Sequence, residues 1–420
     1  MRLLAVWSPV VVSIVLSTAT AGAQGRVVRP TMPLSRTAAA EVALVRSPQS
    51  ALAAADTASA AASVLLARQW ENPTATISAT KSDPQRHYTL DWALDPSWIR
   101  SPRIAAAQAS RDAARLRAAF VRAAIAFDVD TAYTRVQLAA ARSQLSARSA
   151  RDADSLLTLA RVRRDAGDAS TLDVELAGVF AGQSHNTASM DSMAVLTARL
   201  TLLTLMGVPS DSVELRLTDS LSLATVPAVT TVATSTAASA ANASRLLVAA
   251  AGRDVDAASA RVNAERAKRF GTPSVQVGME AMSPGGPVGA MAVAGVSIPL
   301  PVLNRNEASV ALARADLTRA EALRAATAYG SAATVVAAER EAAATRARAE
   351  RSASLVAAAD RIASLSLLAY REGASPLATV LDAQRSARET LAQFYDDIAA
   401  AYTAVGLLRL VITSTSDTHP

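Results

Sequence analysis

The sequence has 420 residues, of which 51% are hydrophobic and only 4% aromatic, so its apolar content is mostly Ala, Leu and Val. This composition favours long, closely packed helices over an aromatic-rich globular core. The formal net charge is +6, but the arginines are spread among alanines and acidic residues, which indicates solvated helix faces rather than a nucleic-acid interface. The chain has no cysteine, which excludes disulfides, thiol chemistry, Cys-ligated metals and a lipid-carrying N-terminal cysteine.

The N-terminus predicts an export signal. Arg2 precedes a short apolar stretch, and the small residues Ala21-Gly22-Ala23 form a cleavage site before Gln24. We therefore expect residues 1–23 to be a cleaved signal peptide rather than a membrane anchor, and residues 24–36 to be a flexible lead. No later segment has about 20 uninterrupted apolar residues, so the mature chain is expected to enter a membrane only as a β-barrel.

The next segments predict a helix, a hairpin and a long helix pair. Residues 38–69 are Ala-rich and helical in character, with an interruption near Ser47-Pro48, and Asn72-Pro73 stops the helix. Alternation over 74–80 predicts a strand, and a second strand is expected over 87–95 after a polar turn at 82–86. Residues 102–163 contain no Pro or Gly after the first residue, and small residues at 3-4 spacing predict a helix of about 60 residues, about 90 Å long.

The rest of the chain repeats this layout. After a break at Gly167, a helix is expected to run to Met206, and residues 208–240 read as a connector with one short alternating piece at 213–217. A helix over 238–270, strands over 274–280 and 288–298 joined by a turn at 283–287, and a helix over 306–370 follow. After Gly373 the last helix runs to about 411. A constant offset of 206 residues relates Gly167 to Gly373.

These observations predict two related halves and their boundaries. The halves are residues 37–208 and 238–412, separated by a connector at 209–237 and followed by a tail at 413–420. Each predicted strand has about nine or ten residues, the length of a tilted membrane-spanning β-strand. The third strand alternates, with Val275 and Val277 on one face and Ser274 and Gln276 on the other, as lipid outside and water inside require.

Four strands cannot close a barrel, and an open sheet edge in lipid is forbidden. Three copies would give twelve strands, so we predict a homotrimer with a shared transmembrane β-barrel. The predicted fold class is mainly α with a small β part, in which long antiparallel helices form an α-helical barrel that extends into the periplasm. The alternative is that the hairpins belong to an ordinary soluble sheet.

Four local segments resemble the TolC-type outer-membrane efflux family. Residues 69–73 (QWENP) resemble its helix-to-barrel transition, and residues 296–306 (VSIPLPVLNRN), the most specific match, resemble its strand-to-helix exit. Residues 164–174 and 370–384 are similar to its periplasmic helix turns. The first half departs from the pattern at residues 94–98, which leaves the end of the second strand open. The resemblance covers essentially the whole mature chain and implies an outer-membrane location, a periplasmic adaptor and an inner-membrane pump of the RND or ABC type.

The resemblance also assigns residues to the periplasmic tip that contacts the adaptor. Glycine permits the positive φ that a tight helix-to-helix turn needs, which agrees with this assignment. The alternative is a structural turn without a partner. The assigned tip residues are Arg164, Gly167, Ser170, Arg371, Gly373 and Ser375.

The family's entrance is narrowed by inner helices and lined by acidic rings. By resemblance, Asp382 is the candidate ring residue, and three copies would concentrate negative field and favour cations. Thr379 stands where the family can carry a second aspartate. Asp173 and Tyr370 match positions that hold the closed state by inter-helix hydrogen bonds, and the Arg partner of that latch is Ser375 here. The alternative for Asp382 is a helix cap or a solvated charge.

Signatures of chemistry are missing from the sequence. The three histidines, His87, His185 and His419, are isolated and lack metal-ligand spacing, and no glycine-rich phosphate loop follows a strand. We expect no cofactor, no metal and no enzymatic activity, and therefore a passive exit duct for small molecules driven by its partners. The open alternatives are a type I protein-secretion duct and a soluble periplasmic coiled-coil adaptor or structural protein. An adaptor would need a lipoyl-like or barrel domain between its helix arms.

Overall fold

The computed structural model describes residues 31–81, 84, 86–209, 214–227, 243–281 and 290–412. The predicted signal peptide, the tail over 413–420 and the hairpin turn over 283–287 lie outside the described residues. Most of the turn over 82–86 and parts of the connector over 209–237 also lie outside them.

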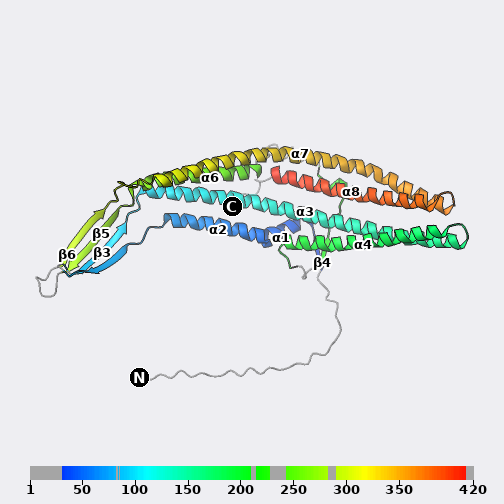
Figure 1. Cartoon of the computed structure of the whole chain (residues 1–420), viewed down its shortest axis with the longest axis horizontal. Helices are drawn as coiled ribbons and strands as arrows, with labels where there is room; N and C mark the ends of the chain where they lie inside the picture. Colours follow the sequence, from blue (N-terminus) through cyan, green and yellow to red (C-terminus); the bar gives the residue numbers. More distant parts are fainter. Residues whose placement is uncertain are drawn as a thin grey trace, which may run out of the picture.

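The chain is an elongated bundle of long helices with a small sheet at one end and two helix-to-helix turns at the other (Figure 1). Its helices are α1 (Arg36–Arg46), α2 (Pro48–Arg68), α3 (Ser97–Asp165), α4 (Thr171–Leu205), α6 (Ala243–Ala267), α7 (Glu307–Arg371) and α8 (Leu377–Ile412). The strands and 3-10 turns are β1 (Thr31–Leu34), β2 (Thr74–Ala79), β3 (Arg86–Ala93), β4 (Glu214–Leu217), η1 (Leu223–Thr225), η2 (Lys268–Phe270), β5 (Ser274–Ala281) and β6 (Ala290–Ser297). The predicted mainly α class is confirmed, and the helices and strands follow one another in the predicted order.

The two hairpins join into one antiparallel sheet with the order β2-β3-β5-β6. The halves meet between β3 and β5, where a Cβ on Gly278 would lie 2.7 Å from the Tyr88 carbonyl oxygen, so this close backbone approach requires glycine. The strand end that the sequence left open falls at Ala93, and the Leu94 amide still donates to the Pro273 carbonyl at 2.8 Å. β2 and β6 are the edges, and neither pairs with a further strand within the described ranges.

The helices next to the sheet follow the order of the strands that they continue. α2 packs on α3, α3 on α6 and α6 on α7, so α2 and α7 occupy the two flanks (Figure 1). These flanking helices are also the two described helices that are long and apolar enough to cross a membrane by length and composition. Only 11% and 6% of their most apolar windows are buried. Neither contains about 20 uninterrupted apolar residues, because polar residues such as Asp56 in α2 and Thr327 in α7 interrupt the apolar runs.

Toward the other end, α3 packs on α4, α7 packs on α8, and α3 also contacts α8. Alanines fill these contacts: Ala153, Ala160 and Ala177 are at most 1% exposed. Near the start of α3, within the stretch where the sequence shows small residues at 3-4 spacing, Ala106 and Ala113 are also buried. The small buried side chains allow the helix backbones to approach closely, as the alanine-rich composition predicts.

The prediction of a flexible lead over residues 24–36 is wrong for the last residues of that segment. β1 lies within it and pairs in parallel with β4, and Arg36 already begins α1, with the Ser35 hydroxyl accepting from the Ala38 amide. Leu34 is fully buried beside Leu215 in the cluster under α1, α3 and α4. The segment has no alternating pattern of its own, and its strand partner lies in the connector, so no local signal predicts it.

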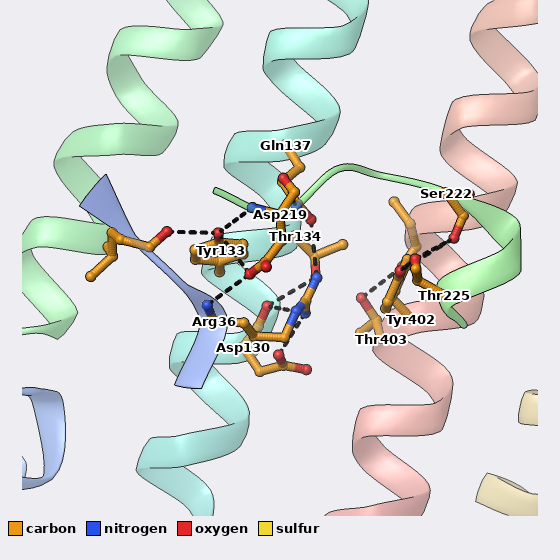
Figure 2. Close-up of polar contacts among 12 residues, drawn as sticks. Arg36, Asp130, Tyr133, Thr134, Gln137, Asp219, Ser222, Thr225, Tyr402 and Thr403 are labelled. Carbon is orange, nitrogen blue, oxygen red and sulfur yellow. Dashed lines mark hydrogen bonds and ion pairs between the residues drawn. The ribbon is translucent and has the colours of Figure 1, made fainter. Parts of the chain in front are cut away.

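Figure 2 shows how Arg36 ties this two-stranded sheet to α3 and α8. Its guanidinium donates to Asp130 Oδ1 at 2.5 Å and to Thr134 Oγ1 at 2.9 Å. The same group lies over two aromatic rings, 5.1 Å from the centroid of Tyr133 and 4.7 Å from that of Tyr402. Cation–π contacts and charged hydrogen bonds therefore hold the start of α1 between the two long helices.

Asp219, in the connector, completes this network from the other side. Its carboxylate accepts from the Arg36 amide at 2.9 Å, and its carbonyl accepts from Gln137 Nε2 at 2.8 Å. The Tyr133 hydroxyl lies within donor distance of two acceptors, 2.9 Å from the Leu34 carbonyl and 3.0 Å from the Asp219 carboxylate. Burial raises the pKa of Tyr133, so the hydroxyl remains a proton donor.

Candidate functional site: the helix-turn tip

Both helix-to-helix turns have the same backbone design. Gly167 (φ +85°) and Gly373 (φ +75°) occupy the left-handed region that follows a helix end. The amide of Gly167 donates to the Arg164 carbonyl at 2.9 Å, and that of Gly373 donates to the Tyr370 carbonyl at 3.1 Å. In each turn the next amide reaches back five residues, at 2.8 Å in both. These are Schellman motifs, so the sequence prediction of positive φ at both glycines is confirmed.

The helix that follows each turn begins differently. Ser170 and Asp173 form a reciprocal capping box on α4: the Asp173 amide donates to Ser170 Oγ at 3.1 Å, and the Ser170 amide donates to Asp173 Oδ2 at 3.0 Å. The Asp173 carboxylate therefore serves a local cap in this structure. On the other turn, α8 begins after Ser375 and Pro376 without an acidic residue in its first turn.

Arg163 joins the two turns, and sequence reasoning missed it. Its guanidinium donates to the Tyr370 carbonyl, lies 3.4 Å from the Asp168 carbonyl, and stacks 4.7 Å from the centroid of the Tyr370 ring. Arg164, which the resemblance assigns to the adaptor contact, pairs with its neighbour Asp165 at 2.6 Å and is exposed. A single-residue step on a helix turns the side chain by about 100°. No pattern in the sequence tells which of the two arginines faces the other turn.

Tyr370 is the buried centre of the tip. It is 3% exposed and packs in a cluster with Leu156, Val174, Leu377 and other apolar side chains of α3, α4 and α8. Its hydroxyl has no hydrogen-bond partner among the described residues. Burial raises the pKa of Tyr370, the Arg163 charge opposes that shift and the Asp173 charge adds to it. The hydroxyl is therefore a neutral donor within the electrostatic influence of Asp173.

The remaining predicted residues lie on the surface of the tip. Arg164, Gly167, Ser170, Arg371 and Gly373 are exposed, and Ser375 is half-buried. Thr379 and Asp382 are exposed and one helical turn apart on α8, while Leu377 and Val380 on the same helix face the buried cluster. The structure thus places Asp173 and Tyr370 near each other and leaves Asp382 facing outward from its own chain.

The described residues hold no group of three or more His, Cys, Asp or Glu side chains arranged for a metal ion. Two of the three histidines lie in simple pairs with one carboxylate each. His87 Nδ1 lies 3.2 Å from Glu280 across the sheet, and His185 Nε2 lies 3.0 Å from Asp154 between α4 and α3. His419 lies outside the described residues.

Replacing Arg163 by alanine should loosen the tip without unfolding the chain. The change removes the cation–π contact and the hydrogen bond to Tyr370 on the other turn, and the contact with the Asp168 carbonyl within its own turn. Together these are worth roughly 1–2 kcal/mol for a half-exposed arginine. Amide hydrogen exchange over 165–170 and 371–376 should therefore become about tenfold faster. The matched control is Arg164→Ala, whose side chain pairs with its neighbour Asp165. Equal exchange rates in the two variants would contradict the role assigned to Arg163.

The arrangement of a four-stranded sheet continued by long helices that end in two tip turns has known counterparts. No protein-family model and no curated protein matches this chain. Among solved structures, it is similar to the outer membrane protein VceC from Vibrio cholerae, with 17% identity, a TM-score of 0.73, and coverage of 90% of this chain and 95% of that one. The CmeC outer membrane channel of Campylobacter jejuni gives 11% identity and a TM-score of 0.73, over 90% and 85% of the chains.

A membrane protein from Pseudomonas aeruginosa is also similar, with 19% identity, a TM-score of 0.72, and coverage of 90% and 93% of the two chains. The chain therefore has the fold of these outer-membrane channels. The resemblance to the TolC-type family that the local segments predict is confirmed at the level of this fold.

Proposed function

We propose that this chain is an outer-membrane channel of the TolC type that serves as the passive exit duct of a tripartite efflux pump. The observation that carries this proposal is the fold, which solved outer-membrane channels share over nine-tenths of the chain. The four-stranded sheet with two unpaired edges adds support, because such edges need partners in lipid. Fractionation tests the location: a mature protein that stays soluble without detergent would rule out a channel.

The same geometry supports a homotrimer. The flanking helices α2 and α7 are apolar but almost unburied within one chain, and they continue the two edge strands of the sheet. Burying both flanks against other copies removes exposed apolar surface and closes the sheet at once. Three copies would supply twelve strands, an even number within the range known for membrane barrels. The mass of the detergent-solubilised complex measures the copy number directly.

The tip is the surface that we assign to the periplasmic adaptor, and through it to an inner-membrane pump. The two Schellman turns present Arg164, Gly167, Arg371 and Gly373 at the end of the bundle that is farthest from the sheet (Figure 1). A Cβ added at Gly167 would meet nothing within 4 Å, so the surface of this turn is open to a partner. A duct that spans the outer membrane at the sheet would direct this end toward the inner membrane.

The proposed entrance ring predicts ion selectivity. Three copies of Asp382 facing one lumen would concentrate cations, so Asp382→Asn should lower the potassium-to-chloride permeability ratio roughly threefold or more. The measurement is the reversal potential of single channels under a salt gradient. Glu321→Gln is the matched control, since Glu321 is an exposed acidic residue on α7 in the half nearer the sheet. An unchanged ratio in Asp382→Asn would rule out Asp382 as the ring residue.

A further inference from the structure

The segment that follows β6 is the most exposed apolar stretch at the junction between sheet and helices. Leu300 is 76% exposed, Val302 72% and Leu303 100%. With Ile298, four of the six residues over 298–303 expose apolar side chains. Exposing such a patch to water is unfavourable. Among the described residues, no element of the same chain covers these side chains. We name this segment the junction loop (298–303).

The junction loop is held rigidly at both ends. At its start, Pro299 lies against Gly271, where a Cβ would come within 2.6 Å of the proline ring. At its end, Asn306 donates through Nδ2 to the Glu265 carbonyl at 2.8 Å and to the Glu265 carboxylate at 2.9 Å. Hydrogen bonds from Lys268 and Asn306 lower the pKa of Glu265, so its carboxylate stays charged and keeps this hold. A loop fixed in this way loses little entropy on docking.

A second exposed apolar surface lies at the end of α2 on the opposite flank. Leu65 and Leu66 are each 70% exposed, and Trp70 is 48% exposed. The Trp70 ring is fixed from one side by the Arg100 guanidinium, 4.6 Å from its centroid, and Arg100 also donates to the Arg68 carbonyl at 2.9 Å. This end-of-α2 patch (Leu65, Leu66 and Trp70) is therefore an exposed apolar surface whose tryptophan ring is already held in place.

The sheet topology brings the two surfaces together between copies, not within one. β6 runs toward the helices and leads into the junction loop, whereas β2 starts just after Trp70 and runs away from the helices. When the open β6 edge of one copy pairs with the open β2 edge of the next, the strands are antiparallel. The residues after β6 then lie beside the residues before the partner's β2. The exposed charges flanking the two surfaces, Arg305 after the loop and Glu71 after the patch, are of opposite sign.

We propose that the junction loop of each copy packs onto the end-of-α2 patch of the next copy, forming an apolar collar where the sheet meets the helices. This inference rests on the proposed shared barrel and specifies a contact that locks neighbouring copies in register. The partner is a second copy of this chain, because both surfaces lie at the edges that must meet when the sheet closes. A lipid-facing loop is the competing outcome of the test.

The absence of native cysteine makes cross-linking a clean test. The double variant L303C/L66C is purified in detergent and oxidised. On a denaturing gel, most of the chains should then run as covalent dimers and trimers. The matched control is L303C/L52C, because Leu52 is also an exposed leucine of α2, at 65% exposure, but lies about 20 Å further along the helix. This control pair should give cross-links no stronger than either single variant.

The outcomes separate this inference from the proposed function. A trimer by native mass without the Leu303–Leu66 cross-link, or with equal cross-linking in the Leu52 control, overturns the collar and leaves the channel standing. A fluorophore on L303C that is quenched by brominated phospholipid in vesicles would show a lipid-facing loop and would also overturn it. A chain that remains monomeric in detergent removes the shared barrel and the collar together.

Discussion

Gly207→Ala is expected to lower the free energy of unfolding by about 3–5 kcal/mol. Gly207 has φ +66°, and a Cβ there would lie 2.2 Å from the Arg46 carbonyl oxygen and 2.8 Å from its carbonyl carbon. The obstacle is backbone, which cannot move aside as a flexible side chain can. The joint between the end of α4 and the end of α1 would have to open, and the buried cluster that contains Leu203 and Met206 would open with it.

Gly252→Ala is the matched control for this prediction. Gly252 lies inside α6, and nothing occupies the space that its Cβ would enter. Alanine has the higher helix propensity, so this variant should be unchanged or more stable by up to about 1 kcal/mol. Urea unfolding in detergent, followed by tryptophan fluorescence, compares the two variants with the parent chain. If both midpoints stayed within error of the parent, the assigned contact between Gly207 and Arg46 would be wrong.

Only part of the importance of Gly207 is visible in the sequence. The predicted end of the helix at Met206-Gly207 is confirmed, because a Schellman turn is a local requirement: the Gly207 amide donates to Thr204 and the Val208 amide to Leu203. The contact with Arg46 depends on how α1 and α4 pack, and residue identity alone does not encode it. The sequence therefore predicts the backbone conformation that a local turn requires, but not the contacts between backbone segments that are far apart in the chain.

The same division runs through the rest of the fold. The hairpin strands and the tip glycines follow from short-range alternation and from the need for positive φ, and both are predicted close to their observed positions. The pairing of β3 with β5, which joins the halves, has no such local signal. β1 lies within the predicted flexible lead, because its four residues contain a proline and no alternation and its partner strand lies in the connector.

At the tip, the sequence predicts the turn and misses the link between the turns. The resemblance correctly places the Schellman glycines, but it does not point to Arg163, whose guanidinium contacts both turns. The predicted adaptor contact of Arg164 stays a prediction. Within its own chain, Asp173 caps the start of α4. The hydrogen bonds by which Asp173 and Tyr370 would hold a closed state stay a prediction. Which face of a long helix turns inward depends on its tertiary neighbours, so a family motif gives the position of a site more reliably than its individual contacts.

Arg36→Ala should be the second most damaging change, with an expected loss of about 2–3 kcal/mol of unfolding free energy. The arginine side chain is 23% exposed and that of Asp130 is 27% exposed, so the pair is only partly screened by solvent. Truncation leaves Asp130 and the oxygen atoms of Thr134 and Gln137 without their donor. It also removes the cation from between two tyrosine rings (Figure 2).

Two further variants distinguish the network from a general effect of removing a charge. Arg36→Lys keeps the charge but loses the planar fork that contacts several acceptors at once, so about half of the loss should remain. Arg135→Ala removes an exposed arginine from the same stretch of α3 and should stay within about 0.5 kcal/mol of the parent chain. Because Arg36 holds the start of α1 beside β1, its loss should also expose residues 31–36 to limited proteolysis. Unchanged protease resistance together with unchanged stability in Arg36→Ala would mean that β1 is held by its pairing with β4 alone.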